Sequence, residues 1–108
     1  MKDITKLLFP YQYNTFTKDN PIPIVGVAIR QNNTIWHLPC PNRHHNVLWL
    51  IYDIMGKLEE YSDDNQGFID ASGKYLNRHD ALVRARLTKQ LRDDREVIGD
   101  QLYSENLW

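Results

Sequence analysis

The sequence predicts an α+β domain: a mainly antiparallel sheet from two hairpins (ββαββα) packed against two helices. Two observations predict this class. Short segments rich in strand-forming residues occur in pairs separated by turn residues, and each pair precedes one helical segment. Because hairpin–helix units repeat without strand–helix–strand alternation, an antiparallel sheet is favoured over a parallel one.

The chain divides into two predicted parts. A length of 108 residues suits one hydrophobic core. Residues 1–21 form an N-terminal arm, whose aromatic residues between Phe9 and Phe16 favour packing on the chain's own core over docking on a partner. Residues 22–108 form a single α+β domain.

The first hairpin is expected from Ile22 to Arg30 and from Thr34 to Leu38. Its turn, Gln31-Asn32-Asn33, contains asparagine, which tolerates the left-handed backbone of such turns. One face of the first strand carries small side chains that lead to Arg30. This face leaves room for another body to approach.

A helix is predicted over Arg43–Leu58, with Asn42 as its N-cap and Gly56 weakening its last turn. Its periodicity predicts that an apolar stripe packs on the sheet. The stripe consists of His44, Val47, Leu48, Ile51, Ile54, Met55 and Leu58. The acidic and polar segment from Glu59 to Gln66 is predicted to be an exposed loop.

The second hairpin is expected at Gly67–Ala71 and Lys74–Leu76, and Asn77 is expected to cap a helix that ends near Leu91 or Arg92. That helix has two predicted stripes. They are Val83, Leu87 and Leu91 on one side, and Arg78, Arg86, Lys89 and Arg92 around the other. The segment Leu102–Trp108 is expected to add an edge strand or to dock by its aromatic end.

Composition excludes several classes of function. A net charge of −1 argues against binding to long nucleic acids. The single cysteine, Cys40, cannot close an internal disulfide, which favours a reducing compartment such as the cytoplasm. No segment approaches the roughly 20 apolar residues that cross a membrane, and the first residues lack a signal-peptide pattern.

Metal and catalytic chemistry are not favoured. The cluster of His37, Cys40, His44 and His45 has irregular spacing, and the two neighbouring histidines project about 100° apart around a helix. We therefore expect no metal ion and no cofactor. The nucleophile, metalloprotease and phosphate-loop motifs are missing, so no catalytic residue is predicted.

Two predicted helix starts carry cationic side chains where free backbone amides attract anions. Arg43 and His44 open the first helix, and Asn77 and Arg78 open the second, after the aromatic Phe68. A phosphate could bind at either start. The alternatives are that Arg43 is a solvated charge, that His44 is a hydrogen-bonded core histidine and that Phe68 is buried.

Three segments carry a resemblance to a known family. They are Cys40–Val47, Gln66–Ile69 with Gly73–Arg78, and Leu102–Trp108. The sequence resembles small bacteriophage proteins, and most of all the Thoeris anti-defence sponges. These proteins capture the cyclic ADP-ribose signal made by host TIR-domain enzymes and, in some members, cyclic oligonucleotides. The likeness covers residues 22–108.

The resemblance implies a ligand-binding domain that acts in the host cytoplasm without changing its ligand. It also implies a homo-oligomer built from dimers, such as a hexamer, with ligand sites between subunits. By position it places Phe68 as the base-stacking ring, Arg30 and Arg78 near phosphates and Asn77 beside them. Arg43 and His44 match the family's Arg-His-His motif at the ligand or at a subunit interface, and Arg95 is a further candidate.

The predicted function is that of a phage anti-defence protein that binds and sequesters a cyclic nucleotide second messenger. The ligand is a cyclic ADP-ribose isomer or a cyclic oligonucleotide, and the protein is not expected to be an enzyme. Two alternatives stay open. One is a nucleotide phosphodiesterase that uses His44 or His45, and the other is a protein inhibitor that docks directly on a host enzyme.

Overall fold

The computed structural model describes residues 21–31, 33–56 and 65–108. The predicted N-terminal arm and most of the predicted polar loop lie outside these residues. The sheet has the strand order β2-β1-β3-β4, and every neighbouring pair is antiparallel. Its strands are β1 (Ile24–Gln31), β2 (Thr34–Pro39), β3 (Gln66–Asp70) and β4 (Tyr75–Asn77). The predicted α+β class is confirmed.

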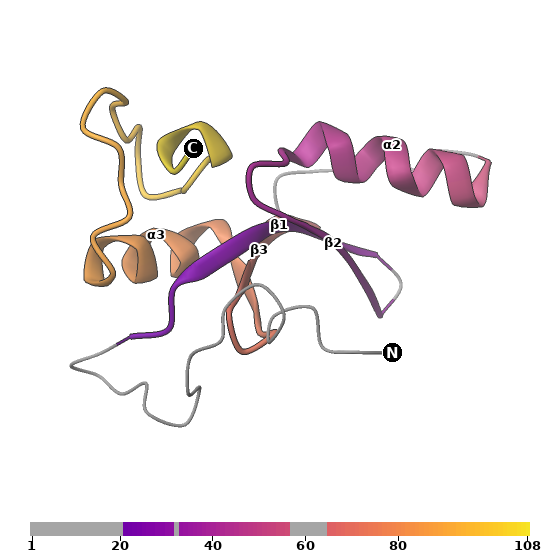
Figure 1. Cartoon of the computed structure of the whole chain (residues 1–108), viewed down its shortest axis with the longest axis horizontal. Helices are drawn as coiled ribbons and strands as arrows, with labels where there is room; N and C mark the ends of the chain where they lie inside the picture. Colours follow the sequence, from indigo (N-terminus) through magenta and orange to yellow (C-terminus); the bar gives the residue numbers. More distant parts are fainter. Residues whose placement is uncertain (1–20, 32, 57–64) are drawn as a thin grey trace.

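Three helical segments complete the part of the fold that the structure describes. They are α2 (His44–Met55), α3 (Arg78–Leu87) and the short 3₁₀ helix η3 (Ser104–Asn106). Figure 1 shows α2 and α3 on the same side of the sheet, with the C-terminal segment lying between them. The element order is the predicted hairpin–helix repeat, followed by a tail that folds back onto both helices.

The hairpin turns follow from local backbone preferences. Asn33 closes the first hairpin with φ 64°, a left-handed conformation that asparagine tolerates better than most residues. Gly73 has φ 87° in the second hairpin. Both turns therefore lie where the sequence predicts them.

One hydrophobic core lies between the sheet and the two helices. Val27 and Ile29 of β1 and Phe68 of β3 are fully buried there, against Val47 of α2 and Leu82 of α3. Leu102 from the C-terminal segment is also fully buried in this cluster. The tail thus belongs to the core of the domain. Its removal would expose apolar surface on both helices.

Helix α2 begins one residue later than the sequence predicts. Its N-cap is Arg43, not Asn42, and the Arg43 backbone N–H donates to Asn46 Oδ1 at 2.8 Å. The helix also ends before the predicted Leu58, because Gly56 follows Met55 in a left-handed conformation with φ 74°. His44 and Val47 are buried as predicted.

The apolar stripe of α2 is only partly buried. Ile54 and Met55, which were expected on the sheet, are 61% and 56% exposed. Figure 1 shows the C-terminal end of α2 projecting beyond the strands, so the described part of the sheet does not cover its last turn.

Helix α3 starts as predicted, and the Asn77 side chain accepts a hydrogen bond from Asp80 N at 2.7 Å. It ends at Leu87, earlier than predicted. The expected apolar stripe is wrong, because Val83 and Leu87 are 49% and 58% exposed. The buried face consists of Arg78, Ala81, Leu82 and Ala85. Alanine side chains let the helix approach the sheet closely, so small residues decided its orientation.

A buried ion pair joins the second hairpin to α3. Asp70 is fully buried, and its Oδ2 lies 2.9 Å from Arg84 Nη1. Its Oδ1 accepts hydrogen bonds from the backbone N–H groups of Ser72 and Lys74 at 2.9 and 3.0 Å. Burial of the carboxylate is tolerated because its oxygens are hydrogen-bonded and its charge is paired.

The C-terminal segment docks by its aromatic end and adds no edge strand. Leu102 N donates to Arg78 O at 3.0 Å, at the start of α3. Trp108 Nε1 donates to Asn42 O at 2.8 Å, next to the start of α2. The segment therefore ties together the two helix starts that the sequence marks as cationic.

Candidate functional site

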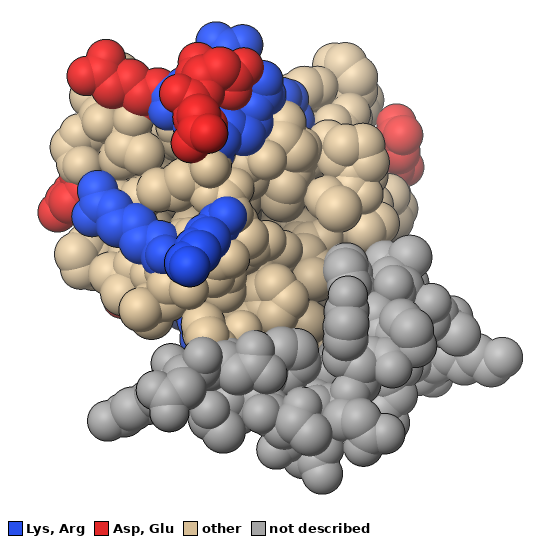
Figure 2. All heavy atoms as spheres, turned by 60° about the vertical axis from the view of Figure 1, so that its left-hand side comes forward, with Lys and Arg blue, Asp and Glu red and all other residues tan. Residues whose placement is uncertain are grey.

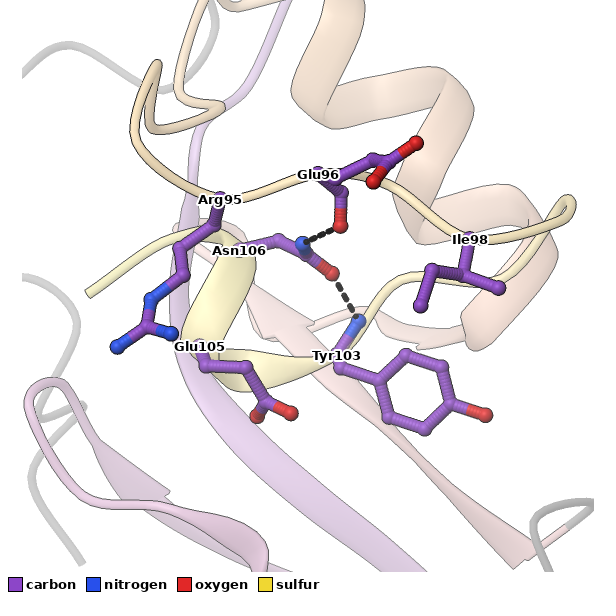
Figure 3. Close-up of a pocket in the computed structure, with 6 residues that line it drawn as sticks. All are labelled: Arg95, Glu96, Ile98, Tyr103, Glu105 and Asn106. Carbon is purple, nitrogen blue, oxygen red and sulfur yellow. Dashed lines mark hydrogen bonds between the residues drawn. The ribbon is translucent and has the colours of Figure 1, made fainter.

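A hollow of about 490 Å³ opens beside η3. We call it the C-terminal hollow, and its lining residues are Arg95, Glu96, Ile98, Tyr103, Glu105 and Asn106. Figure 3 shows these side chains projecting from two stretches of chain, one on each side of the opening. Both stretches belong to the segment that follows α3.

Asn106 joins the two walls of the hollow. This residue is 4% exposed. Its Oδ1 accepts from Tyr103 N at 2.9 Å, and its Nδ2 donates to Glu96 O at 3.2 Å (Figure 3). A buried amide that holds one backbone group on each side fixes the spacing between them.

Tyr103 presents the aromatic surface of the hollow. Its ring centroid lies 4.3 Å from the Arg78 guanidinium carbon, a cation–π contact. Arg78 is only 5% exposed, and its guanidinium donates to Leu102 O at 2.7 Å and to Gln66 Oε1 at 2.9 Å. The Tyr103 ring is therefore braced from the protein side by a buried cation.

Arg43 braces the other end of η3. Its guanidinium donates to the backbone oxygen of Trp108 and to Ser104 Oγ at 3.4 Å. Its Nη1 also lies 3.7 Å from Glu105 Oε2. These contacts are with protein atoms, so Arg43 orients the segment that carries Glu105 and does not itself line the hollow.

A second arginine–tyrosine pair lies on the sheet. The guanidinium carbon of Arg30 is 5.2 Å from the centroid of the Tyr75 ring. Burial raises the pKa of the Tyr75 hydroxyl, and the positive charges of Arg30 and Arg78 oppose that rise. The Tyr75 ring leans over Gly67, where an added Cβ would lie 2.6 Å from Tyr75 Cζ. The space beside Gly67 is thus filled by the protein itself.

Phe68 and His44 are both buried in the core, which is the alternative that the sequence left open for them. Phe68 is fully buried in the core, so neither face of its ring is available to a base in this conformation. His44 is 8% exposed, and its ring centroid lies 5.1 Å from that of Phe68 in a T-shaped arrangement. Its Nε2 lies 2.7 Å from Gly67 O. Both side chains belong to the hydrophobic core, because strand β3 alternates and puts Phe68 on the face covered by α2.

The structure brings three of the seven predicted ligand residues to the C-terminal hollow. Arg95 lines it directly, Arg78 supports it through Tyr103, and Arg43 supports it through Glu105. Arg30 lies with Tyr75, and Asn77 serves as the α3 cap. Tyr103 and Glu105 were missed as individual residues, although both lie in the Leu102–Trp108 segment that carries the resemblance.

Comparison with known protein families identifies the family of the chain. Residues 23–108 match the model of a family described as phage T4 y16D protein. The chain belongs to the phage T4 y16D protein family. No curated protein and no solved structure matches it at a significant level.

The surface of this y16D family member carries mixed charge. Figure 2 shows acidic and basic side chains side by side at one edge of the face drawn. Arg92 donates to both carboxylate oxygens of Asp94, at 2.9 and 2.6 Å, and this bonding lowers the pKa of Asp94. Arg78 is buried, so the expected basic stripe on α3 is not continuous at the surface.

The described residues can also be compared with the requirements of metal sites and membrane spans. Within residues 21–31, 33–56 and 65–108, no group of three or more potential metal ligands comes together. None of the helices in these ranges has the length and apolar character to span a membrane. For the y16D family member, the lining of the C-terminal hollow combines a tyrosine ring and an arginine with the Glu105 carboxylate.

Proposed function

We propose that this phage protein binds a cyclic nucleotide immune signal in the C-terminal hollow and sequesters it without cleaving it. The ligand is a cyclic ADP-ribose isomer or a cyclic oligonucleotide, and the site of action is the host cytoplasm. One observation carries the proposal. The Tyr103 ring, braced by Arg78 at 4.3 Å, lines the same hollow as Arg95.

Each part of a nucleotide has a chemical partner in this hollow. A base stacks on a tyrosine ring, and alanine substitution of such rings costs roughly 1–3 kcal/mol per base. A phosphate binds the planar fork of an arginine such as Arg95. The volume of about 490 Å³ lies within the range of roughly 300–1,000 Å³ that is usual for small-molecule sites.

We also propose that the active form is a homo-oligomer built from dimers, and that the outer face of α2 forms one interface. Trp49, Tyr52, Ile54 and Met55 are each more than half exposed on this helix. Large exposed aromatic and apolar side chains that gather on one element are typical of protein interfaces. A second copy of the chain would remove them from water.

Calorimetry followed by recovery of the ligand tests the function. Purified full-length protein is titrated with cyclic ADP-ribose, and the complex is then denatured and the released compound analysed by chromatography. We expect saturable binding and an intact compound. A cleaved product would establish the phosphodiesterase alternative instead.

The inhibitor alternative predicts a different result. In that case the protein inhibits a host enzyme without retaining any nucleotide, and deletion of residues 1–20 abolishes the inhibition. Under sequestration, the same deletion leaves ligand capture in place.

Tyr103 provides the matched pair of variants for this site. Tyr103→Ala removes the stacking surface and should weaken cyclic ADP-ribose binding about fivefold to 150-fold, from the roughly 1–3 kcal/mol expected for a stacked base. Tyr103→Phe keeps the ring and should bind nearly as the wild type does. Equal affinity of all three proteins, each shown to melt cooperatively, would mean that Tyr103 does not contact the ligand.

A further inference from the structure

The carboxylate of Glu105 is held by one of its two oxygens. Oε2 lies 3.7 Å from Arg43 Nη1 and 3.5 Å from Ser104 Oγ. In the part of the chain that the structure describes, no hydrogen bond to Oε1 is formed. The side chain is 54% exposed, so Oε1 is accessible from the hollow that Glu105 lines.

Arg43 is itself fixed by contacts that do not involve Glu105. Its backbone caps α2 through Asn46, and its guanidinium holds the Trp108 oxygen and Ser104 Oγ. The planar guanidinium keeps a set direction in a way that a lysine ammonium cannot. The position of the Glu105 carboxylate therefore follows from the packing of the tail on α2.

The charges of the hollow favour a particular kind of ligand. Arg95 supplies one positive charge, while Glu96 and Glu105 supply two negative ones. Arg43 offsets the charge of Glu105 from outside. A site with one arginine and more than one carboxylate suits a ligand that brings hydroxyl donors to Glu105 as well as a phosphate to Arg95.

Ribose is the part of a nucleotide that brings such donors. Acidic side chains accept hydrogen bonds from ribose hydroxyls at many dinucleotide sites. Figure 3 shows the Glu105 carboxylate between Arg95 and the Tyr103 ring in that view. In a nucleotide the sugar likewise lies between the phosphate and the base.

We propose that Glu105 accepts hydrogen bonds from ribose hydroxyls and thereby selects ligands that carry them, with Arg43 as its positioning residue. This inference rests on the proposed function, because it assigns a partner to the sugar of the same ligand. It adds a specificity that stacking and phosphate binding alone do not supply, since those contacts are shared by ribose and deoxyribose ligands.

The inference is tested by comparing the affinities of two proteins, wild type and Glu105→Gln, for ligands with and without a ribose hydroxyl. Wild type and Glu105→Gln are each titrated with cyclic ADP-ribose and with the analogues that lack the 2′-hydroxyl of one ribose or the other. A hydrogen bond to a charged acceptor predicts that the wild type binds cyclic ADP-ribose at least about tenfold more tightly than one of these analogues. Glu105→Gln should reduce that preference to about threefold or less, because a neutral acceptor bonds more weakly.

Glu96→Gln is the matched control, because it makes the same change at a carboxylate that points away from Glu105 and Tyr103 in Figure 3. Its preference should stay as in the wild type. Thermal melting of all three proteins shows whether they are folded, and if Glu105→Gln does not fold, the wild-type titrations decide.

Three results would overturn the inference. They are equal affinities of the wild type for all compounds, an unchanged preference in folded Glu105→Gln, and an equal loss of preference in Glu96→Gln. If the wild type binds none of the compounds, the proposed function fails and this inference fails with it. Binding without hydroxyl preference overturns the inference alone.

Discussion

Arg78 is a site residue by its sequence position and a core residue by its structure, and this conflict can be tested. Sequence reasoning alone expects that Arg78 can be replaced with loss of ligand binding and no loss of fold. The structure predicts instead that replacing Arg78 lowers the stability of the fold. The Arg78 residue is only 5% exposed. Its guanidinium donates hydrogen bonds to Leu102 O and Gln66 Oε1 and makes a cation–π contact with the Tyr103 ring.

The cost of Arg78→Met can be worked out from these contacts. Each hydrogen bond from a charged donor contributes roughly 1.5–3 kcal/mol, and the cation–π contact adds about 1 kcal/mol. Methionine keeps the apolar volume and avoids burying a charge, which offsets part of the loss. We expect the free energy of unfolding to fall by about 3–5 kcal/mol. For a domain of this size, the melting temperature should drop by about 12–20 °C.

Urea unfolding and thermal melting, followed by circular dichroism, measure this change. Arg86→Met is the matched control, because Arg86 lies on the exposed side of the same helix. Its unfolding free energy should stay within about 0.5 kcal/mol of the wild-type value. If Arg78→Met costs less than about 1 kcal/mol, the contacts at Leu102 and Gln66 do not hold the tail, and the structural role of Arg78 is refuted.

Two further predictions concern the sheet and the surface of α2. Burial raises the pKa of Tyr75 above its usual value of 10.0, so the folded state keeps a proton that the unfolded state has lost. Wild-type stability should therefore fall relative to Tyr75→Phe as the pH rises above about 10, and urea unfolding from pH 8 to 11 would show a constant difference if this reasoning is wrong. Trp49→Glu places a charge on the exposed face of α2 and should shift the protein toward monomers in native mass spectrometry, while an unchanged mass distribution would move the interface elsewhere.

Local chemistry made much of the fold predictable. The Asn33 turn and the Asn77 cap depend on residues within a few positions of one another. The antiparallel class followed from the order of hairpins and helices. Helix faces were less predictable, because the burial of Ala81 and Ala85 and the exposure of Leu87 depend on how closely α3 approaches the sheet.

The candidate site was predictable only in part. The sequence marked the two cationic helix starts and the terminal motif as chemically unusual, and both starts contact that motif in the structure. It could not show that Arg43 and Arg78 would be engaged by the tail, because those contacts join residues far apart in the chain. The resemblance placed Phe68 at a ligand and the sequence left its burial as the alternative, since alternation alone does not tell which face of a strand is covered.

The sequence by itself determined which segments form the strands and hairpin turns and which residue caps α3, because those choices depend on nearby backbone preferences. Only the tertiary structure decided that the tail packs between α2 and α3, that Tyr103 rests on Arg78, and that Glu105 and Arg95 line one hollow. The physical reason is that a binding surface depends on which distant segments share a core. That pairing depends on the burial of whole side chains such as Leu102, and local preferences do not encode it.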